Sequence, residues 1–241
     1  MNLAAVTPTL TANDTCAVYY LGTVAYQSAS LLQENLLKAR RQGEINDDIV
    51  LVLQHPPVLT LGKSGLQPEH ILVSRARLKL EGIPLCHSSR GGGITYHGPG
   101  QLLCYPIFDL RRRGLTVRQY LRNLEEVIID LLAGSGIIAH RSPDTPGVRV
   151  NDAEIASIGI YVSHGITMHG FTLNVNTDLS RFSYISVCGV PGKKMTSVAQ
   201  LSGTEPNIED FFTPMIRSLG RVFHLDMRSA KATALREYFG E

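Results

Sequence analysis

The chain has 241 residues, of which 44% are hydrophobic, and a formal net charge of +2 with an isoelectric point near 8.4. This length and apolar content predict one globular domain with a sizeable core. The small net charge argues against a general nucleic-acid-binding role, which needs a concentrated basic face. The sequence has no apolar run long enough to span a bilayer and no signal-peptide pattern, so we expect a cytoplasmic protein.

The first third of the chain predicts a short leader followed by the start of a folded domain. Residues 1–16 show no periodicity, and we expect a flexible leader before a domain that covers residues 17–241. Residues 16–21 alternate as a strand does, residues 25–40 have helical spacing, and residues 49–53 form a buried strand. That strand leads to His55, which either faces a ligand or simply ends the strand.

A glycine-rich segment follows at residues 88–106, with the sequence SSRGGGITYHGPGQLLCYP. The glycines at 91–93 let the backbone approach a bound group closely, and Arg90 adds a fork of donors beside them. Pro99 and its two glycine neighbours predict a second bend, which turns His97 and Gln101 toward one pocket. Two such bends favour a ligand-binding loop over a surface turn. The segment matches neither the phosphate-binding nor the dinucleotide-binding glycine pattern.

The rest of the chain predicts a mixture of strands and helices. Residues 102–110 form a strand and residues 117–134 an amphipathic helix. Three strands follow at 147–150, 154–162 and 167–175, joined by turns at 151–152 and 163–165. Residues 208–224 and 230–239 have helical spacing. A single α+β domain accounts for this order of elements.

The four cysteines predict neither a zinc site nor a disulfide framework. Cys16, Cys86, Cys104 and Cys188 include no C-x-x-C pair and no histidine at ligand spacing, so we expect reduced thiols and no metal. Cys104 lies in an apolar run and is typical of a core residue. Cys188 precedes a glycine in the loop SVCGVPG, where its sulfur can be accessible to a substrate.

The run RGGGITYHGPGQ resembles the signature of the lipoyl(octanoyl) transferases. Further motifs of that family follow in the same order: His55-Pro56-Pro57 with Gly62, Pro146-Gly147-Val148, Ser157-Ile158-Gly159, His169-Gly170-Phe171, Leu173-Asn174-Val175 and Cys188-Gly189. The resemblance covers residues 17–225. It implies the fold of biotin and lipoate protein ligases and transferases, in which helices flank a mixed, mostly antiparallel sheet.

The resemblance also implies an activity and its partners. An octanoyl group would move from octanoyl-acyl carrier protein to a lysine of a lipoyl domain, either in 2-oxoacid dehydrogenases or in the glycine cleavage H protein. The implied route is a Cys188 acyl-thioester, which the acceptor amine then attacks without ATP or another cofactor. Neither nucleic acid nor membrane is implied as a partner.

The positions that match the family's motifs give a set of candidate site residues. Cys188 matches the acyl-thioester cysteine. The substrate-binding positions are Arg90, Gly91, Gly92, Gly93, Ile94, Thr95, Tyr96, His97, Ser157, Ile158, Gly159, Gly170, Phe171 and Thr172. Segments 157–159 and 170–172 are expected, with the glycine loop, to supply backbone donors and walls for the acyl chain.

One catalytic position departs from the family. A lysine in the context K-[IV]-x-[SA]-x-G is expected to lower the pKa of the cysteine thiol, but this chain reads Glu154-Ile155-Ala156-Ser157-Ile158-Gly159. A carboxylate there disfavours the thiolate, whose parent thiol has a pKa near ~8.5. Each unit by which that pKa rises is worth about 1.4 kcal/mol.

Three explanations of Glu154 follow. A substitute cation reaches Cys188, the nearest in sequence being Lys193 and Lys194, with His97 and His169 as candidate bases; we take Lys194 as the catalytic candidate. Alternatively, the protein binds acyl groups with weak or no turnover. In the third, burial holds Glu154 protonated. A rival enzyme class, the ATP-dependent lipoate–protein ligases, is disfavoured by Cys188 and by the GPGQ continuation.

Overall fold

A mixed sheet of eight strands forms the centre of the protein. The computed structural model describes residues 14–65, 70–143, 145–186 and 193–240. Within them the strand order is β11-β1-β2-β6-β10-β9-β8-β7. The bounds are β1 (Thr15–Thr23), β2 (Asp48–Gln54), β6 (Gln101–Ile107), β7 (His140–Arg141), β8 (Gly147–Val150), β9 (Ala153–Ser163), β10 (Ile166–Asn174) and β11 (Asp226–Ala230). Because only β1 pairs in parallel, with β2 and β11, the expected mostly antiparallel sheet is confirmed.

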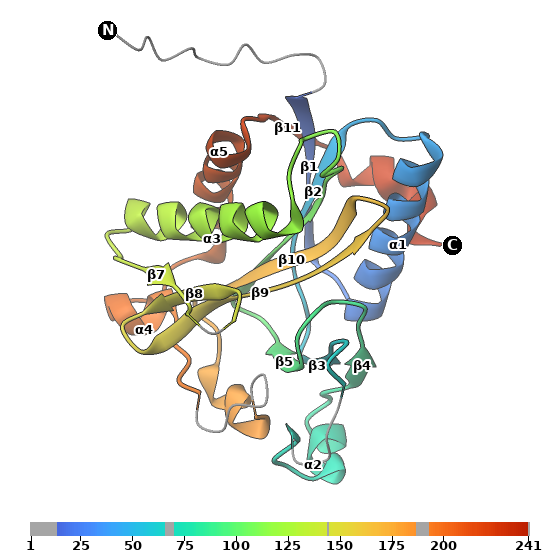
Figure 1. The fold of residues 1–241 in the computed structure, drawn as a ribbon. Coiled ribbons are helices and arrows are strands. Elements are labelled where there is room, and N and C mark those ends of the chain that lie inside the picture. The colour runs from blue at the N-terminus through green and yellow to red at the C-terminus, as the bar shows by residue number, and fades with distance from the viewer. Residues whose placement is uncertain (1–13, 66–69, 144, 187–192, 241) are drawn as a thin grey trace, which may run out of the picture.

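A second, small sheet carries part of the glycine-rich segment. Its order is β4 (Leu85–His87), β3 (Val58–Leu61) and β5 (Ile94–His97), and it lies below the large sheet in Figure 1. The short helix α2 (Arg75–Leu80) extends beyond it. The chain returns from β5 to the centre of the large sheet through β6, so the two sheets are directly continuous at residues 98–100.

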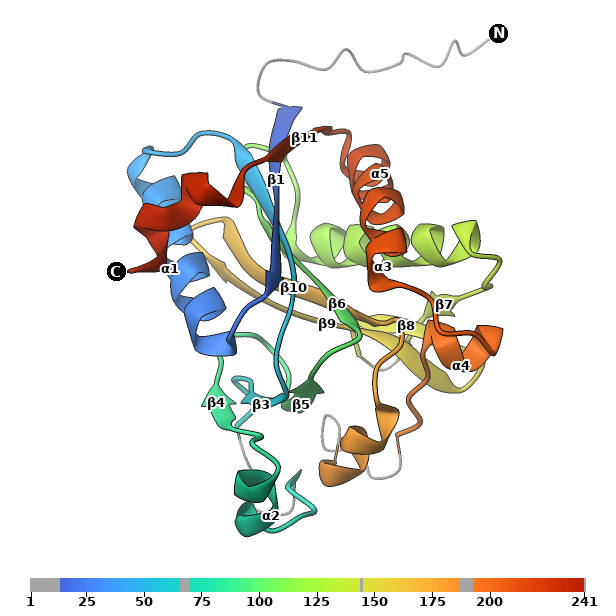
Figure 2. The ribbon, with the colours of Figure 1, turned by 180° about the vertical axis from the view of Figure 1, so that it is seen from behind.

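Helices cover both faces of the large sheet, as Figures 1 and 2 show. On one face lie α3 (Val117–Gly134) and α5 (Phe212–Phe223), which follows the short turn η5 (Ile208–Phe211). On the other lie α1 (Tyr26–Gln42) and η6 (Ala232–Phe239). Two shorter helices, η3 (Leu179–Tyr184) and α4 (Val198–Ser202), follow β10.

Alternating side chains of the central strand β6 fill the two cores. Leu102 and Cys104 pack in the cluster under α3 and α5, whereas Leu103 and Tyr105 pack in the cluster under α1. Successive side chains of a strand point to opposite faces, so a continuous apolar run is what a strand covered on both faces requires. The prediction that Cys104 is a small core residue is confirmed, since it has no exposed surface.

Most of the predicted elements form within a few residues of their expected bounds. The helix at 117–134 starts where predicted because Thr116 and Gln119 form a reciprocal capping box. Residues 1–13 of the predicted leader lie outside the described residues, but Thr15 and Cys16 already belong to β1. The last predicted helix is the 3₁₀ element η6, and residues 226–230 before it form the edge strand β11.

None of the helices in the described part of the chain combines the length and the apolarity needed to cross a membrane.

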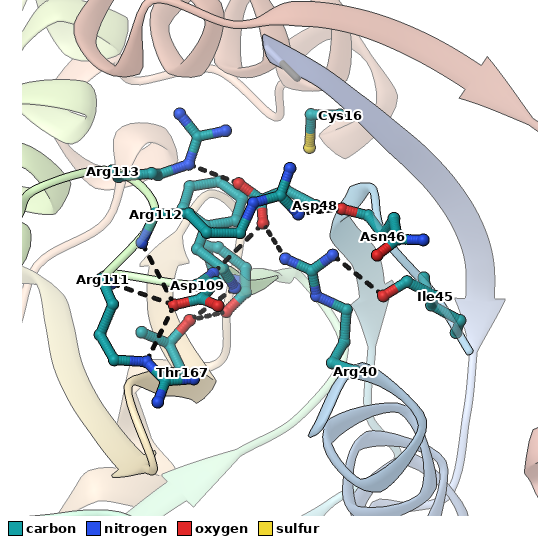
Figure 3. A network of polar contacts seen from close by, with 12 residues as sticks. Cys16, Arg40, Ile45, Asn46, Asp48, Asp109, Arg111, Arg112, Arg113 and Thr167 are labelled. Atoms are coloured by element: carbon teal, nitrogen blue, oxygen red, sulfur yellow. Dashed lines mark hydrogen bonds and ion pairs between the residues drawn. The ribbon is translucent and has the colours of Figure 1, made fainter. Parts of the chain in front are cut away.

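A buried ion-pair network joins the start of β2 to α1 and to the turn after β6 (Figure 3). Asp48 contacts Arg40 of α1, with Nη2 and Oδ1 2.5 Å apart, and also Arg113. It accepts a further hydrogen bond of 3.2 Å from the backbone N–H of Asp109. Burial raises the pKa of Asp48, an effect that the two guanidinium groups oppose. Asp48 therefore links three segments that are distant in sequence.

Three consecutive arginines, residues 111–113, follow β6 and contact this network or its neighbours. Arg113 pairs with Asp48 and is almost fully buried, and Arg112 donates to the carbonyl of Asn46. Arg111 and Arg112 are exposed, and Arg111 contacts the carboxylate of Asp109. Of the three arginines, Arg113 is therefore the one that takes part in the ion-pair network of Asp48.

Replacing Asp48 by Asn should destabilise the fold strongly. The substitution leaves the guanidinium groups of Arg40 and Arg113 buried without their counter-charge, which typically costs about 3–5 kcal/mol. Urea unfolding measures the change. Asp47→Asn, at the exposed neighbouring position, is the control and should change the free energy of unfolding by less than about 0.5 kcal/mol. Equal effects of the two substitutions would contradict a structural role for the network.

Candidate active site

A cavity of about 390 Å³ lies between the glycine-rich segment and strands β9 and β10. Three stretches that the sequence singled out contribute to its wall: residues 90–93, residues 157–160 and residues 169–172. Thr95, His97 and Glu154 complete the predicted part of the lining. The volume falls within the range of sites for small organic ligands. The structure therefore brings together motifs that are distant in the sequence.

Backbone hydrogen bonds fix the glycine segment against the turn that follows β3. The N–H groups of Gly62, Lys63 and Ser64 donate to carbonyl oxygens of residues 90–93 over 2.9–3.1 Å. A Cβ atom at Gly62 would lie 2.3 Å from the carbonyl oxygen of Gly92, so only glycine allows this approach. The N–H of Gly91 is also engaged, donating to the carbonyl of Ile160 over 2.8 Å. The loop is therefore preorganised, and the Gly91 amide serves the fold.

Arg90 is a buried cation in the cavity wall. Its Nη2 donates to both the carbonyl and the hydroxyl oxygen of Thr60 over 2.8 Å, and its Nη1 donates to the carbonyl of Gly91 over 3.0 Å. Only 9% of the residue is exposed. These contacts hold the guanidinium in one orientation, as expected for a planar fork of donors.

Three buried histidines gather on the α1 side of the cavity. His97 contacts Gln101 through Nδ1 (3.1 Å) and Thr60 through Nε2 (3.2 Å), and His169 contacts Ser89 through Nε2 (2.9 Å). Burial lowers the pKa of His55 to about 4 and that of His169 to about 3, and for His169 the charge of Arg90 adds to the effect. Burial, His55 and Arg90 together lower the pKa of His97 well below its usual range. All three rings are neutral at pH 7.

His55 lies behind the cavity wall, and both of its ring nitrogens have hydrogen-bond partners. Its Nδ1 contacts the carbonyl of Val24 at 2.6 Å and its Nε2 contacts the hydroxyl of Tyr105 at 2.9 Å. Of the two interpretations left open by the sequence, the structure favours the strand-end role, in which His55 acts on the cavity through Tyr105.

The predicted substrate-binding residues Ile94 and Tyr96 do not line the cavity. Both belong to the apolar cluster below it, where the ring of Tyr96 packs edge-on against Phe182. The reason is the alternation of β5, which turns Thr95 and His97 toward the cavity and their neighbours away from it. Of the four predicted residues 94–97, the structure thus places Thr95 and His97 at the cavity and Ile94 and Tyr96 in the apolar cluster.

Glu154 lies at the cavity as half of an ion pair. Its Oε2 is 2.6 Å from the ammonium of Lys193, and its Oε1 accepts a hydrogen bond of 2.5 Å from the hydroxyl of Ser157. Lys194, the predicted catalytic candidate, is exposed and faces Glu154 only through its backbone carbonyl.

Burial makes the three described cysteines poor nucleophiles. Cys16, Cys86 and Cys104 are free thiols with buried side chains, and burial raises the pKa of each. Cys188, the predicted nucleophile, lies outside the described residues. The described residues contain no group of three or more His, Cys, Asp or Glu side chains placed to hold a metal ion.

Two aromatic residues of the cavity escaped the sequence analysis. Tyr26, the first residue of α1, stacks on His97 with ring centroids 6.2 Å apart, and Tyr105 of β6 also lines the wall. Tyr105 was part of the glycine-rich segment and lies on the same face of β6 as Leu103, so strand alternation could have identified its face. No local sequence pattern indicates that Tyr26 lines the cavity, because its position there depends on the packing of α1 against β5.

Residues 25–220 match the family described as the lipoyl protein ligase A/B catalytic domain. An octanoyltransferase from Chloroflexus aurantiacus is 42% identical over 217 residues, which are 89% of this chain and 96% of that protein. An octanoyltransferase from Solibacter usitatus is 43% identical over 212 residues, 88% of this chain and 94% of that protein. The chain therefore belongs to the lipoyl protein ligase A/B catalytic-domain family, and the resemblance to octanoyltransferases is confirmed.

Solved structures confirm the fold expected from that resemblance. A crystal structure of lipoate-protein ligase A bound with ATP superposes with a TM-score of 0.77 at 18% identity, covering 94% of this chain and 95% of that one. Protein Ta0514 from T. acidophilum with bound lipoic acid gives a TM-score of 0.75 at 18% identity, with coverages of 93% and 92%. At this identity the likeness concerns the fold alone.

The lowered histidine pKa values predict a loss of stability in mild acid. An unfolded histidine titrates near 6.5 but His55 near about 4 in the fold, so the unfolded chain binds more protons in this window. Stability should therefore fall as the pH is lowered from about 6.5 toward 4, by up to about 1.4 kcal/mol per pH unit for each such histidine.

Proton NMR of the imidazole Cε1–H groups checks this directly. Three resonances should keep their neutral-form shifts from pH 8 to pH 5, whereas all histidines of the urea-unfolded chain titrate near about 6.5. Titration of His55, His97 and His169 above pH 6 in the folded protein would refute the assignment of neutral rings.

Proposed function

We propose that this chain is an octanoyltransferase, which moves an octanoyl group from octanoyl-acyl carrier protein to a lysine of a lipoyl domain. The observation that carries the proposal is the 42% identity with the Chloroflexus aurantiacus octanoyltransferase over 96% of that protein. The acceptors would be the lipoyl domains of 2-oxoacid dehydrogenases and the glycine cleavage H protein. The cavity supports the proposal because three of the family's motifs line it.

The cavity suits an uncharged acyl chain. His97 and His169 are neutral, and the wall includes the apolar side chains of Ile158, Ile160 and Phe171. Each methylene of an octanoyl chain that leaves water contributes about 0.8 kcal/mol of binding free energy. The preorganised glycine loop and the fixed guanidinium of Arg90 form the polar end of the site, beside which a thioester carbonyl would lie.

The proposed chemistry has two acyl transfers through Cys188. The thiolate attacks the thioester carbonyl, a new C–S bond forms, and the carrier thiolate leaves and takes up the proton that Cys188 released. The acceptor amine then attacks the acyl-enzyme, a C–N bond forms while the C–S bond to Cys188 breaks, and the proton lost by the amine returns to the Cys188 sulfur. The sequence of steps needs a positive charge near Cys188, for which Lys193 and Lys194 are the candidates adjacent in sequence.

A second candidate is an acyl-binding protein with little or no turnover. The specific observation in its favour is Glu154, a carboxylate at the cavity in a position where the resemblance leads us to expect a lysine. A carboxylate alone would disfavour a neighbouring thiolate. The transferase, this candidate and the ATP-dependent ligase can be distinguished by whether Cys188 carries an octanoyl group and by whether modification of the acceptor needs ATP.

Intact-mass spectrometry separates these functions. The protein is incubated with octanoyl-acyl carrier protein at pH 7 without ATP, and parallel samples contain Cys188→Ala or, as a matched control, Cys86→Ala. We expect an octanoyl adduct on the native protein and on Cys86→Ala but none on Cys188→Ala. No adduct on the native protein would refute the transferase, and acceptor modification only with octanoate and ATP would establish a ligase.

A further inference from the structure

A groove of about 490 Å³ lies beside α2, the helix that extends beyond the small sheet in Figure 1. It shares no lining residue with the cavity of the candidate active site. Its apolar lining includes the buried side chains of Leu78 and Ile83, and the exposed Arg75 and Lys79 of α2 line it as well. The groove therefore combines an apolar base with positive charge.

Backbone hydrogen bonds attach the walls of this groove to the small sheet. The N–H of Ile83 donates to the carbonyl of Leu78 over 2.9 Å, which closes the turn after α2. The carbonyl of Pro84 accepts a hydrogen bond of 2.9 Å from the N–H of Leu59 on β3. Because a partner would not have to order these groups, the groove is suited to binding.

The segment around the groove concentrates the positive charge of the chain. Residues 70–87 contain three basic residues and one acidic residue, so their net charge of +2 equals that of the whole protein. The acidic residue, Glu81, contacts Arg77 with Oε1 and Nε 3.0 Å apart, and also Arg181. Arg75 and Lys79 form no ion pair with another residue that the structure describes, so their charges are available to an acidic partner.

Exposed apolar side chains flank these charges. Leu72 is 59% exposed and Leu80 is 87% exposed, and they follow Ile71 and Lys79 of the groove directly in the sequence. Grouped exposed apolar side chains mark interaction sites, and protein interfaces typically have an apolar centre with a charged rim. The surface therefore fits a protein with acidic side chains around an apolar one.

The groove and the cavity lie on either side of one short segment. His70 lines the cavity, and the next residue, Ile71, lines the groove. The segment is held in place, because the carbonyl of His70 accepts a hydrogen bond of 2.9 Å from the N–H of Ser186 and Ile71 forms an antiparallel bridge with Ile185. A protein in the groove would therefore have to deliver an acyl group past this segment on a long arm.

We propose that the groove beside α2 is the docking surface for the acyl carrier protein that delivers the octanoyl thioester. This inference rests on the proposed function for the identity of the acyl donor. Acyl carrier proteins are acidic and carry the acyl group on a long phosphopantetheine arm, whereas a lipoyl domain presents only a lysine side chain and must dock closer to the cavity. Arg75 and Lys79 contact carboxylates of the carrier, and an apolar carrier side chain enters the groove. Such opposite charges raise the association rate and are screened by salt.

The test measures binding of the carrier without turnover. The probe is a fluorescently labelled octanoyl-acyl carrier protein in which an amide replaces the thioester, and its anisotropy is followed at low salt. Arg75→Glu/Lys79→Glu should raise the Kd by about tenfold and remove most of its salt dependence. Both side chains are exposed, so the variant should fold as the native protein does.

The matched control reverses two charges on another helix. Lys38 and Arg41 are exposed on α1, and Lys38→Glu/Arg41→Glu changes the net charge by the same amount. The control should keep the Kd within about twofold of the native value, because surface charges more than a Debye length from an interface are largely screened. Equal weakening by the two double variants would overturn the proposal, since it would show an effect of net charge alone.

Two further measurements separate docking from chemistry. Pro84→Glu adds a carboxylate at an exposed position of the groove and leaves Arg75 and Lys79 in place, and it should also weaken carrier binding. With octanoyl-pantetheine, which lacks the carrier protein, kcat and KM should be unchanged in every variant, whereas KM for octanoyl-acyl carrier protein should rise with the Kd. A rise in KM for both donors would contradict a docking role.

The inference and the proposed function fail in different ways. An octanoyl adduct on the native protein together with an unchanged Kd in Arg75→Glu/Lys79→Glu would refute the docking surface and leave the transferase intact. Carrier binding that depends on Arg75 and Lys79, without any adduct, would refute the transferase while supporting the docking surface. Weaker binding of a lipoyl domain, but not of the carrier, would assign the groove to the acceptor and overturn the proposal.

Discussion

The candidate site depends on the hydrogen bonds between residues 62–64 and the glycine segment. They bring two backbones so close that a Cβ at Gly62 would lie 2.3 Å from a carbonyl oxygen. The contact turns a flexible sequence of three glycines into a fixed wall, and the bond from Gly91 to Ile160 attaches that wall to β9. Because these hydrogen bonds join groups of the chain itself, the protein orders the loop, which lowers the entropy cost of binding a ligand.

The charged side chains described around the cavity are Arg90 and Glu154, and each contacts other groups of the protein. Arg90 donates hydrogen bonds to Thr60, burial keeps His97 and His169 neutral, and Glu154 is paired with Lys193. An apolar chain can enter such a site without displacing a counter-ion. The Lys193–Glu154 pair is almost fully buried, so solvent only weakly screens a change in either of its two charges.

The periodic parts of the fold were predictable from the sequence. The helix at 117–134 carries its own capping box, and the strands at 147–150, 153–163 and 166–174 are joined by turns whose residues favour positive φ at Asn151, His164 and Gly165. The glycine segment was recognisable because glycine and proline restrict the backbone locally. Local signals of this kind need no knowledge of tertiary contacts.

The remaining features depend on contacts between distant segments. The edge strand β11 forms only because β1 offers a parallel partner, and the orientation of Ile94 and Tyr96 depends on the pairing of β5 with β3. Glu154 was conspicuous in the sequence, and Lys193 was one of two neighbouring candidates. That Lys193 and not Lys194 pairs with Glu154 depends on the hydrogen bonds between residues 194–196 and Glu154, which no sequence pattern encodes.

The most direct test of the account is a chase experiment on the isolated acyl-enzyme. Protein treated with octanoyl-acyl carrier protein is separated from the carrier and mixed with a lipoyl domain in the absence of ATP, and both masses are followed in time. The account predicts that the octanoyl group leaves Cys188 as it appears on the lysine of the lipoyl domain, in equal amounts. A stable acyl-enzyme with an unmodified lipoyl domain would contradict it and would indicate a protein that binds acyl groups without transferring them.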